Sequence, residues 1–228
     1  MSERELYDLE VEWEQREGNK EELLEKIPTE LLEEGDVLYE QGNPPVEFSL
    51  VKVGKVEVAK YSAEADKTIL GIFGPGEPIG ALAVINEFPY PARVTALQDT
   101  IVYRISGDLV EQLQEEFPAW FSECIGQTAG RMNNLASRFQ SMTTQDIGGR
   151  LSKQLCDLIE QYGQEVEDGI KIDTKITRQM LADMVGCRVE SAIRKLSEWE
   201  QKGLISTDES FITITDPHRL SSIASEES

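Results

Sequence analysis

The chain has few of the side chains that bind metals or form disulfide frameworks. Its 228 residues include three cysteines, Cys124, Cys156 and Cys187, and one histidine, His218. Cysteines spaced so widely indicate neither a disulfide framework nor a zinc knuckle. One histidine is too few for a typical catalytic zinc or iron site. We therefore expect no metal centre and, without a recognisable nucleophile arrangement, no enzymatic activity.

Long apolar runs are also missing. No stretch reaches the roughly 18 consecutive apolar residues that a membrane-spanning helix needs, and the acidic N-terminus does not resemble a signal peptide. We therefore expect a cytoplasmic protein with no membrane partner. Hydrophobic residues make up 39% of the chain, which is ordinary for a soluble protein. At this length the chain can form two domains, each with its own core.

The segment 174–206 shows helical periodicity that is interrupted by a glycine. Apolar residues at helical spacing precede Gly186, and a second periodic run follows it. The two apolar sets are Leu181, Met184 and Val185, and then Val189, Ala192, Ile193, Leu196 and Trp199. Two short helices joined by a glycine-containing turn form a helix-turn-helix, whose second helix can enter a DNA major groove about 12 Å wide.

The ends of these two helices carry suitable capping residues. Thr177 is expected to cap the first helix, and Lys202-Gly203 to end the second with a cation and a glycine. The segments 204–205 and 211–214 alternate like strands on either side of a polar turn. The pattern therefore predicts a β wing after the second helix.

Positively charged residues are scarce. The 22 Lys and Arg residues face 43 Asp and Glu residues, giving a formal net charge of −21. This is the wrong sign for a protein that approaches phosphates. Three interpretations stay open. The acidic residues can lie away from a locally basic contact helix, the host cytoplasm can be salty enough to screen the repulsion, or the partner is not a nucleic acid.

The region from about Glu34 to Ser106 consists of short β-type runs separated by glycines. The runs are 35–42, 48–61, 68–85 and 92–105, which we interpret as an antiparallel meander. Glycines at positions 35, 42, 54, 76 and 80 suit tight turns. Short strands at this spacing favour a sandwich or jelly roll.

Two helices are expected next, a short one at 107–118 and a long one that runs to about Met142. The long helix has a row of residues, apolar except for Thr128, at alternating steps of four and three. They are Phe121, Ile125, Thr128, Met132, Leu135, Phe139 and Met142. This spacing is typical of a coiled-coil seam and predicts a parallel homodimer. The alternative is packing on the chain's own β domain. Gly126 and Gly130 lie off the seam, where we expect a close approach of the β domain.

The flanking segments are less informative. Residues 1–34 are rich in Glu, with Leu6, Leu9, Leu23, Leu24 and Ile27 scattered between. We expect helical turns that pack a few apolar side chains on the next domain, with a protein-partner site as the alternative. Asp146 is a suitable cap for a helix over 147–159, which Gly148-Gly149 would weaken locally into a flexible joint. The segment 162–173 is interpreted as a polar, acidic loop.

The motifs together resemble one bacterial family. TRQ at 177–179 followed by GC-x-x-E-S-x-x-R at 186–194 resembles the recognition unit of the CRP/FNR transcription regulators. Upstream, G-D-x-L-Y-x-x-G, V-x-x-G-x-V, P-G-x-x-I-G and A-L-x-D-T are similar to the cyclic-nucleotide-binding β-roll of that family. The resemblance implies an α+β chain: an acidic N-terminal helical segment (1–30), a jelly-roll or β-roll sensor domain (31–117), a dimerisation helix (118–143) and a winged helix-turn-helix domain (144–228).

The resemblance also implies which residues contact DNA. Glu190 would accept from cytosine N4, and Arg194 would donate twice to guanine. The remaining set, for phosphates or secondary base contacts, is Thr177, Arg178, Gln179, Arg188, Val189, Ser191 and Lys195. Val189 stands where the cyclic-AMP regulator has Arg and FNR-like members have an apolar residue. This favours a half-site such as TTGAT over TGTGA, although Ile193 departs from the Ser used there. The alternative is a plain solvated face, above all for Arg188 and Lys195.

The effector pocket departs from the nucleotide-binding members of the family. Gly80-Ala81-Leu82 lacks the Glu that takes the ribose hydroxyl, and Tyr90-Pro91-Ala92 lacks the Arg that pairs with the phosphate. Arg93 lies two or three residues too late, and Leu135-Ala136 replace the Thr-Ser pair used against the base. No cysteine precedes Cys124 and no histidine lies in the β-roll, so iron–sulfur and haem sensing are not expected. We expect an effector other than cyclic AMP, or none, with a rearranged Arg93 as the alternative.

Cys187 is expected to begin the second helix of the helix-turn-helix, where a helix N-terminus lowers a thiol pKa and makes oxidation a further possible signal. The alternative is a small packing residue.

The expected partners are double-stranded DNA, a second copy of the chain and RNA polymerase. The segment 162–173 is a candidate for the contact with RNA polymerase. The rival is an interaction module whose acidic winged domain meets protein instead of DNA.

Overall fold

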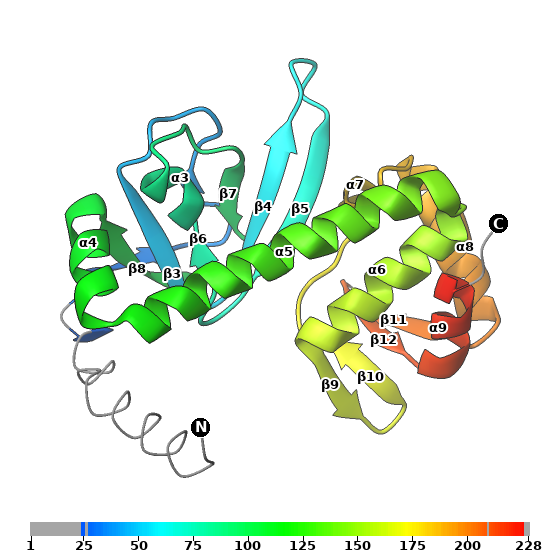
Figure 1. Ribbon diagram of the computed structural model, residues 1–228. Coiled ribbons are helices and arrows are strands. Elements are labelled where there is room, and N and C mark those ends of the chain that lie inside the picture. The colour runs from blue at the N-terminus through cyan, green and yellow to red at the C-terminus, as the bar shows by residue number, and fades with distance from the viewer. Residues whose placement is uncertain (1–23, 26, 209, 226–228) are drawn as a thin grey trace, which may run out of the picture. The chain divides into compact units, whose positions relative to one another are not determined.

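The structure, a computed structural model, describes residues 24–225 except residues 26 and 209 (Figure 1). Within it the chain forms two compact units. One contains the described residues up to Val58 together with Ile72–Arg131, and the other contains Ala59–Gly71 together with the described residues from Met132 onward. Most of the acidic segment 1–30, including Leu6, Leu9 and Leu23, therefore lies outside the described residues. In this part of the chain no helix combines the length and the apolar character required to cross a membrane.

The first half of the described chain is mainly β. Its elements are β1 (Thr29–Leu32), β2 (Val37–Tyr39), β3 (Glu47–Val53), β4 (Val56–Tyr61), β5 (Lys67–Phe73), β6 (Pro78–Ile79), α3 (Ala81–Ile85), β7 (Arg93–Ala96), β8 (Thr100–Ser106) and α4 (Gly107–Glu116). Two four-stranded sheets form, ordered β1-β8-β3-β6 and β2-β7-β4-β5. The jelly-roll prediction is confirmed, but the meander is wrong, because strands distant in sequence pair with each other.

The two faces of β3 explain how the β-roll packs. Successive side chains of a strand point to opposite faces. Leu50 therefore joins a core with Leu113 of α4 and Trp120 of the following helix, whereas Val51 joins a second core with Val56. Full burial of such a side chain contributes about 1.5–3 kcal/mol. Helices thus cover one face of the β1-β8-β3-β6 sheet, while its other face packs inside the roll.

The start of the described chain joins the same core. Ile27 is buried there, and Leu24 packs against it. For these two residues the prediction that the acidic segment packs apolar side chains on the next domain is confirmed.

The long helix α5 (Pro118–Thr144) follows α4 as expected. Gly126 and Gly130 do not mark a close approach to the β-roll. No described atom lies within 4 Å of where a side chain at either position would begin. That part of the prediction is wrong, because both glycines face open space on this helix.

The second half of the described chain forms a small helical domain with a four-stranded sheet. Its elements are α6 (Ile147–Tyr162), β9 (Gly163–Val166), β10 (Gly169–Ile172), α7 (Arg178–Val185), α8 (Val189–Gln201), β11 (Ile205–Asp208), β12 (Phe211–Ile214) and α9 (Pro217–Ser225). The sheet order is β11-β12-β10-β9. The winged helix-turn-helix prediction is confirmed.

Two local predictions in these regions are wrong. The segment 162–173 is a hairpin of β9 and β10, not a loop, and its polar composition fits because β9 is an exposed edge strand. The run 68–85 ends in the short helix α3, not in a strand.

Candidate nucleic-acid interface

The turn between α7 and α8 depends on a glycine. Thr177 caps α7 by accepting a hydrogen bond from the Met180 amide at 3.1 Å. Gly186 ends α7 in the left-handed conformation, with φ 65°, which a side chain would disfavour. Cys187 N then donates to Ala182 O at 3.1 Å, which closes the turn. The capping residues therefore fix where α7 stops and α8 begins.

One face of each helix is buried against the domain core. Leu181, Met184, Leu196 and Trp199 are all at most 2% exposed. The opposite face of α8 carries Glu190 and Arg194, four residues apart and both exposed. Because residues at this spacing are neighbours on a helix surface, the two side chains form one polar patch. We call the exposed face that contains them the α8 outer face.

The α8 outer face also contains residues that the sequence interpretation did not assign. Ser197 and Gln201 are exposed along it, and so is Ile193, which is 46% exposed and which the sequence pattern wrongly grouped with the buried apolar side chains. Helical spacing from Glu190 would have found Ser197 at seven residues and Gln201 at eleven. Arg188 is the exposed N-cap of α8, while Val189 and Ser191 are half-buried beside it.

Lys195 lies on another side of α8. Its Nζ pairs with Glu198 at 2.9 Å, and its Cε lies 3.4 Å from where a side chain at Gly148 would begin. Lys195 therefore flanks the start of α6, away from the α8 outer face. Gly148 and Gly149 both lie buried in the first turn of α6, which Asp146 caps at 2.8 Å through the Gly149 amide.

The first turn of α7 is tied to the wing. Arg178 Nη2 donates to Thr207 Oγ1 of β11 at 2.9 Å and lies 4.0 Å from Glu200. Gln179 is exposed and donates to Asp183 at 2.6 Å. Arg178 is thus positioned by its contacts within the domain, whereas Thr177 and Gln179 face solvent.

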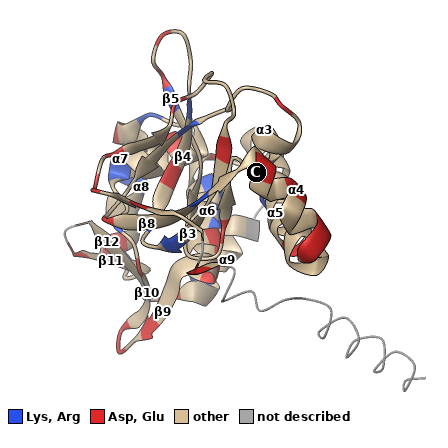
Figure 2. Ribbon diagram, turned by 90° about the vertical axis from the view of Figure 1, so that its left-hand side faces the viewer, with Lys and Arg blue, Asp and Glu red and all other residues tan. Residues whose placement is uncertain are grey.

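The charge of the helix-turn-helix differs from that of the chain. Residues 174–206 contain six Lys and Arg against four Asp and Glu, a net charge of +2 within a chain of −21. The acidic excess thus lies in other segments, and Figure 2 marks both kinds of residue along the ribbon. A locally positive motif is the arrangement that phosphate binding requires.

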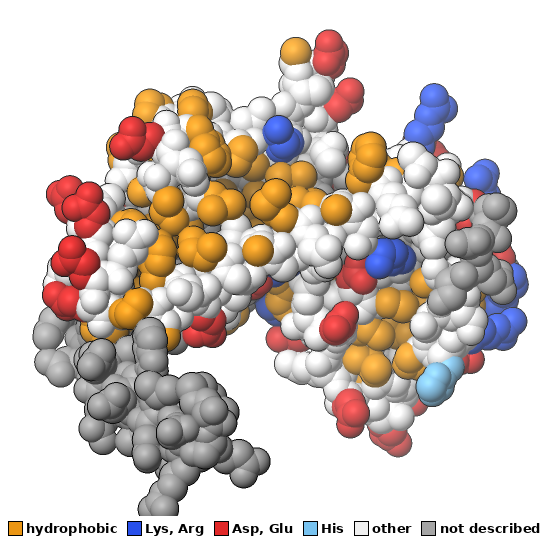
Figure 3. All heavy atoms as spheres, viewed as in Figure 1, with side chains coloured by type: hydrophobic (Ala, Val, Ile, Leu, Met, Phe, Trp, Pro, Cys, Tyr) orange, Lys and Arg blue, Asp and Glu red, His pale blue; other side chains and the backbone are white. Residues whose placement is uncertain are grey.

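Helix α5 exposes apolar side chains along its length (Figure 3). In the predicted seam, Phe139 is 71% exposed, Met132 62% and Met142 38%. The other four seam residues, Phe121, Ile125, Thr128 and Leu135, are half-buried. A line of large apolar side chains left in water is typical of a protein–protein interface.

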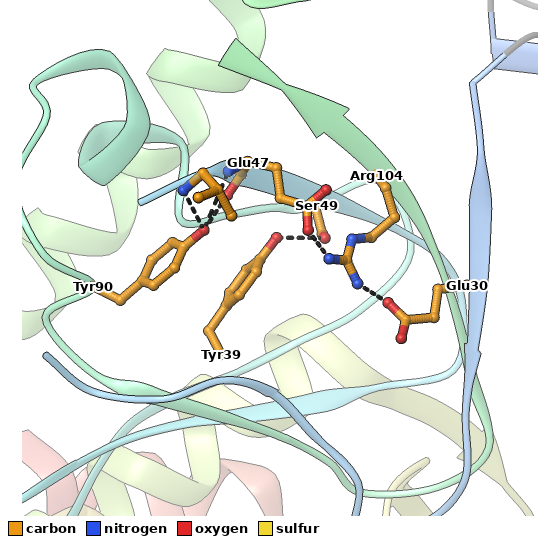
Figure 4. A network of polar contacts seen from close by, with 7 residues as sticks. Glu30, Tyr39, Glu47, Ser49, Tyr90 and Arg104 are labelled. Carbon is orange, nitrogen blue, oxygen red and sulfur yellow. Dashed lines mark hydrogen bonds and ion pairs between the residues drawn. The ribbon is translucent and has the colours of Figure 1, made fainter. Parts of the chain in front are cut away.

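Two tyrosines occupy the region of the expected effector pocket (Figure 4). The rings of Tyr39 and Tyr90 stack with centroids 4.3 Å apart and planes at 14°. Tyr39 shares a 2.7 Å hydrogen bond with Ser49, and the Tyr90 hydroxyl donates to Glu47 O. Burial raises the pKa of both phenols. The pair is therefore a packed, hydrogen-bonded part of the β-roll.

Among the remaining residues of that pocket, the cationic group of Arg93 is already paired with a carboxylate. Gly80 has φ 82°, and a side chain there would begin 3.1 Å from the Tyr90 ring. Ala81 is buried and Leu82 half-buried. Arg93 makes two hydrogen bonds to Glu40, at 2.8 and 2.9 Å. A phosphate would have to displace that carboxylate to reach the guanidinium.

Removing the Tyr90 ring should destabilise the β-roll strongly. Tyr90→Ala leaves a cavity beside Tyr39 and should lower the free energy of unfolding by about 3–5 kcal/mol, the range for truncating a buried aromatic side chain. Tyr90→Phe keeps the stack but leaves Glu47 O without its donor, and should cost about 1–3 kcal/mol. Urea unfolding measures both variants. Equal stability of Tyr90→Ala and the unaltered protein would contradict a packing role.

Cys187 does not have the expected low pKa. It precedes the N-cap Arg188 instead of lying in α8, and burial raises the pKa of its thiol, a shift that Arg150 only partly opposes. The prediction of a lowered pKa is therefore wrong, because desolvation outweighs the helix terminus.

We expect peroxide treatment to change DNA binding equally in the unaltered protein and in Cys187→Ala, because the protonated thiol reacts slowly. Gel-shift titrations before and after oxidation measure this. A loss of affinity confined to the unaltered protein would restore Cys187 as a redox sensor.

Comparison with known proteins agrees with this architecture. Residues 29–117 match the family model of the cyclic nucleotide-binding domain, and residues 149–223 match that of the Crp-like helix-turn-helix domain. A β-roll of this type followed by a winged helix-turn-helix defines a DNA-binding transcription regulator. Among the described residues, no cluster of His, Cys, Asp and Glu suits a metal ion.

The chain belongs to the CRP/FNR family of transcription regulators. It is 29% identical to the anaerobic regulatory protein of Bacillus subtilis (strain 168) over 198 residues, 83% of this chain and 80% of the relative. It is 20% identical to the CRP-like cAMP-activated global transcriptional regulator of Mycobacterium tuberculosis (strain CDC 1551 / Oshkosh) over 186 residues, 82% of this chain and 83% of the relative. The solved structure of FixK2 from Bradyrhizobium japonicum shares the fold with TM-score 0.75 and 16% identity, covering 86% of this chain and 96% of that one.

Proposed function

We propose that this regulator binds a palindromic DNA operator as a parallel homodimer and that the α8 outer face contacts the bases. The single observation that carries this proposal is the exposed Glu190–Arg194 pair on a helix-turn-helix of net positive charge. An acceptor and a bidentate donor on one helix face suit cytosine and guanine edges in a major groove. FNR-like half-sites such as TTGAT are the first operators to test.

The supporting contacts follow from the positions described above. We assign Thr177, Arg178, Gln179, Arg188, Val189, Ser191 and Lys195 to phosphate or secondary contacts. Thr177 and Arg188 lie at helix N-termini, where amide groups favour anions. Of these residues, Lys195 has the least structural support as a DNA contact, since it faces α6 and pairs with Glu198.

The predicted seam of α5 supplies the dimer contact in this proposal. A two-fold dimer holds two recognition helices for half-sites about 34 Å apart. The division into an N-terminal segment (1–30), a β-roll (31–117), a dimerisation helix (118–143) and a DNA-binding domain (144–228) is part of the same proposal, as are cytoplasmic function and contact with RNA polymerase.

The effector of this regulator, if it has one, is proposed to differ from cyclic AMP. The stacked Tyr39–Tyr90 pair, the alanine at position 81 and the Arg93–Glu40 pair all oppose a cyclic nucleotide in that pocket. We expect isothermal titration with cyclic AMP to give no binding heat. The alternative is a cyclic-nucleotide-responsive regulator, and saturable binding that shifts DNA affinity would favour it.

A salt series distinguishes DNA binding from a protein-interaction role. In gel shifts with an FNR-like palindrome, the logarithm of affinity should fall linearly with the logarithm of salt concentration, because bound phosphates release counterions. A scrambled duplex of equal length is the control. If no duplex binds at any salt concentration, the acidic winged domain meets another protein.

A further inference from the structure

A small cavity lies within the second compact unit, where the end of α5 meets α6 and α7. Its lining includes Arg138 of α5, Arg150, Lys153 and Gln154 of α6, and Met184 of α7. The cavity has a volume of about 10 Å³, room for the centre of one sphere the size of a water molecule or a small ion. A nucleotide or a phosphate ester is too large for it.

Positive charge around this cavity exceeds the negative charge that neutralises it. In its described hydrogen bonds, Arg138 donates only to neutral main-chain oxygens. These are Leu70 O at 2.8 Å, Ile69 O at 2.9 Å, and Met184 O. The nearest ion pair is a long one, with Lys153 Nζ 3.9 Å from Asp157 Oδ1. The cavity is therefore lined by three cationic side chains, Arg138, Arg150 and Lys153. The one carboxylate described near them, Asp157, forms only a long ion pair with Lys153.

Burial shifts the pKa values of Arg138 and Asp157, each in the direction that disfavours the charged form. Burial lowers the pKa of Arg138, and the Asp157 carboxylate only partly opposes that shift. Burial also raises the pKa of Asp157, despite the opposing effect of Lys153 and Arg138. A buried guanidinium without a close counter-ion is costly, so an additional negative charge here would stabilise the domain.

The cavity lining also holds polar atoms without partners. Among the described residues, no group accepts from Arg150 Nε and none donates to Gln154 Oε1, although both atoms are buried. Gln154 itself is only 8% exposed. A half-turn of its amide replaces the acceptor by a donor without changing the shape of the side chain. Arg150 Nε and the Gln154 amide, both on residues that line the cavity, would then be buried donors that an anion can satisfy.

We propose that this cavity binds one small monovalent inorganic anion, with chloride as the expected occupant. The excess of cationic side chains favours an anion over water, and a space of this size suits a monatomic anion. The anion lies against Met184 and Val185 at the end of α7. Anion binding stabilises the packing of α7, the first helix of the helix-turn-helix, against α5 and α6. The stability of that domain therefore depends on which anion is present.

Thermal unfolding in sodium chloride and sodium gluconate at equal ionic strength provides the first test. Screening of the acidic surface is the same in both salts, whereas gluconate is too large for the cavity. We expect the melting temperature to rise with chloride relative to gluconate and this difference to fall by at least half in Arg150→Gln. Arg219→Gln, which removes an exposed cation of the same domain, should keep the full difference.

Lys153→Gln provides a second variant should Arg150→Gln fail to fold, because the Lys153 side chain is 33% exposed. It should reduce the chloride-specific difference as well. Equal melting temperatures of the unaltered protein in the two salts would overturn the proposal. An unchanged chloride effect in the variant that folds would overturn it equally.

Anomalous diffraction from crystals grown in sodium bromide provides the direct test. A bromide peak between Arg150 and Arg138 is the expected result. Density there without an anomalous signal would identify a water molecule and would overturn the anion assignment.

Discussion

Arg194→Ala should reduce operator binding to the level of a random duplex while the protein stays folded and dimeric. A bidentate arginine–guanine contact discriminates by about 1–3 kcal/mol, which corresponds to roughly 5- to 150-fold in affinity at each half-site. Arg194 is exposed, so we expect its truncation to leave the core of the domain intact. Footprinting and fluorescence anisotropy on the operator measure the loss, and preference for the guanine should relax at the same time.

Arg219→Ala is the matched control, because it removes the same charge from an exposed position of the same domain. It should leave the footprint and the base preference intact. An unchanged footprint with Arg194→Ala would remove the assignment of base contacts to the α8 outer face.

Phe139→Glu should convert the dimer to a monomer and weaken operator binding by roughly 10²- to 10⁴-fold, the gain that linking two binding units provides. Phe139 is 71% exposed, so a glutamate there does not disturb the core of the single chain. In a paired seam it would place two like charges in an apolar contact, which costs several kcal/mol. Sedimentation equilibrium gives the oligomeric state, and gel shifts give the affinity.

Gln140→Glu is the control for this change. Residue 140 is exposed, adjacent and off the seam, so the variant adds the same negative charge without entering the predicted contact. It should remain dimeric. If Phe139→Glu sediments as a dimer with full affinity, another surface must join the subunits, or the operator is bound by one copy.

Local signals in the sequence were sufficient for most of the helical half. The Thr177 and Asp146 caps and the Gly186 turn were all predicted correctly, because each depends on a few neighbouring residues. The short helix expected at 107–118 was also found, and it ends at Glu116, two residues before Pro118. Helical periodicity also placed Ala192, Leu196 and Trp199 correctly on the buried face of α8, but it wrongly grouped the exposed Ile193 with them. These features involve contacts within a few positions along the chain.

Non-local features were harder to predict. The pairing of β1 with β8 joins residues 29–32 to residues 100–103, and no local pattern specifies such a partner. The hairpin of β9 and β10 was missed because an exposed edge strand has the same polar composition as a loop. At Cys187, the helix terminus suggested a low pKa, but the opposite and larger effect of burial depends on packing that spacing does not reveal.

The expected effector pocket contains features of both kinds, those that the sequence predicted and those that it did not. Sequence comparison alone identified the missing carboxylate at Ala81 and the displaced Arg93. It did not predict that Tyr90 would stack on Tyr39, since these residues lie on distant parts of the chain. Nor did it predict that Glu40 would already hold the Arg93 guanidinium.

Arg138 has a consequence for how this regulator can vary among related organisms. Its acceptors are the main-chain oxygens of Ile69, Leu70 and Met184, which every amino acid supplies. Substitution at any of those three positions leaves the acceptor in place, so only position 138 is constrained by the contact. We therefore expect these positions to drift independently during evolution, and the contact to leave no correlated pair of substitutions behind.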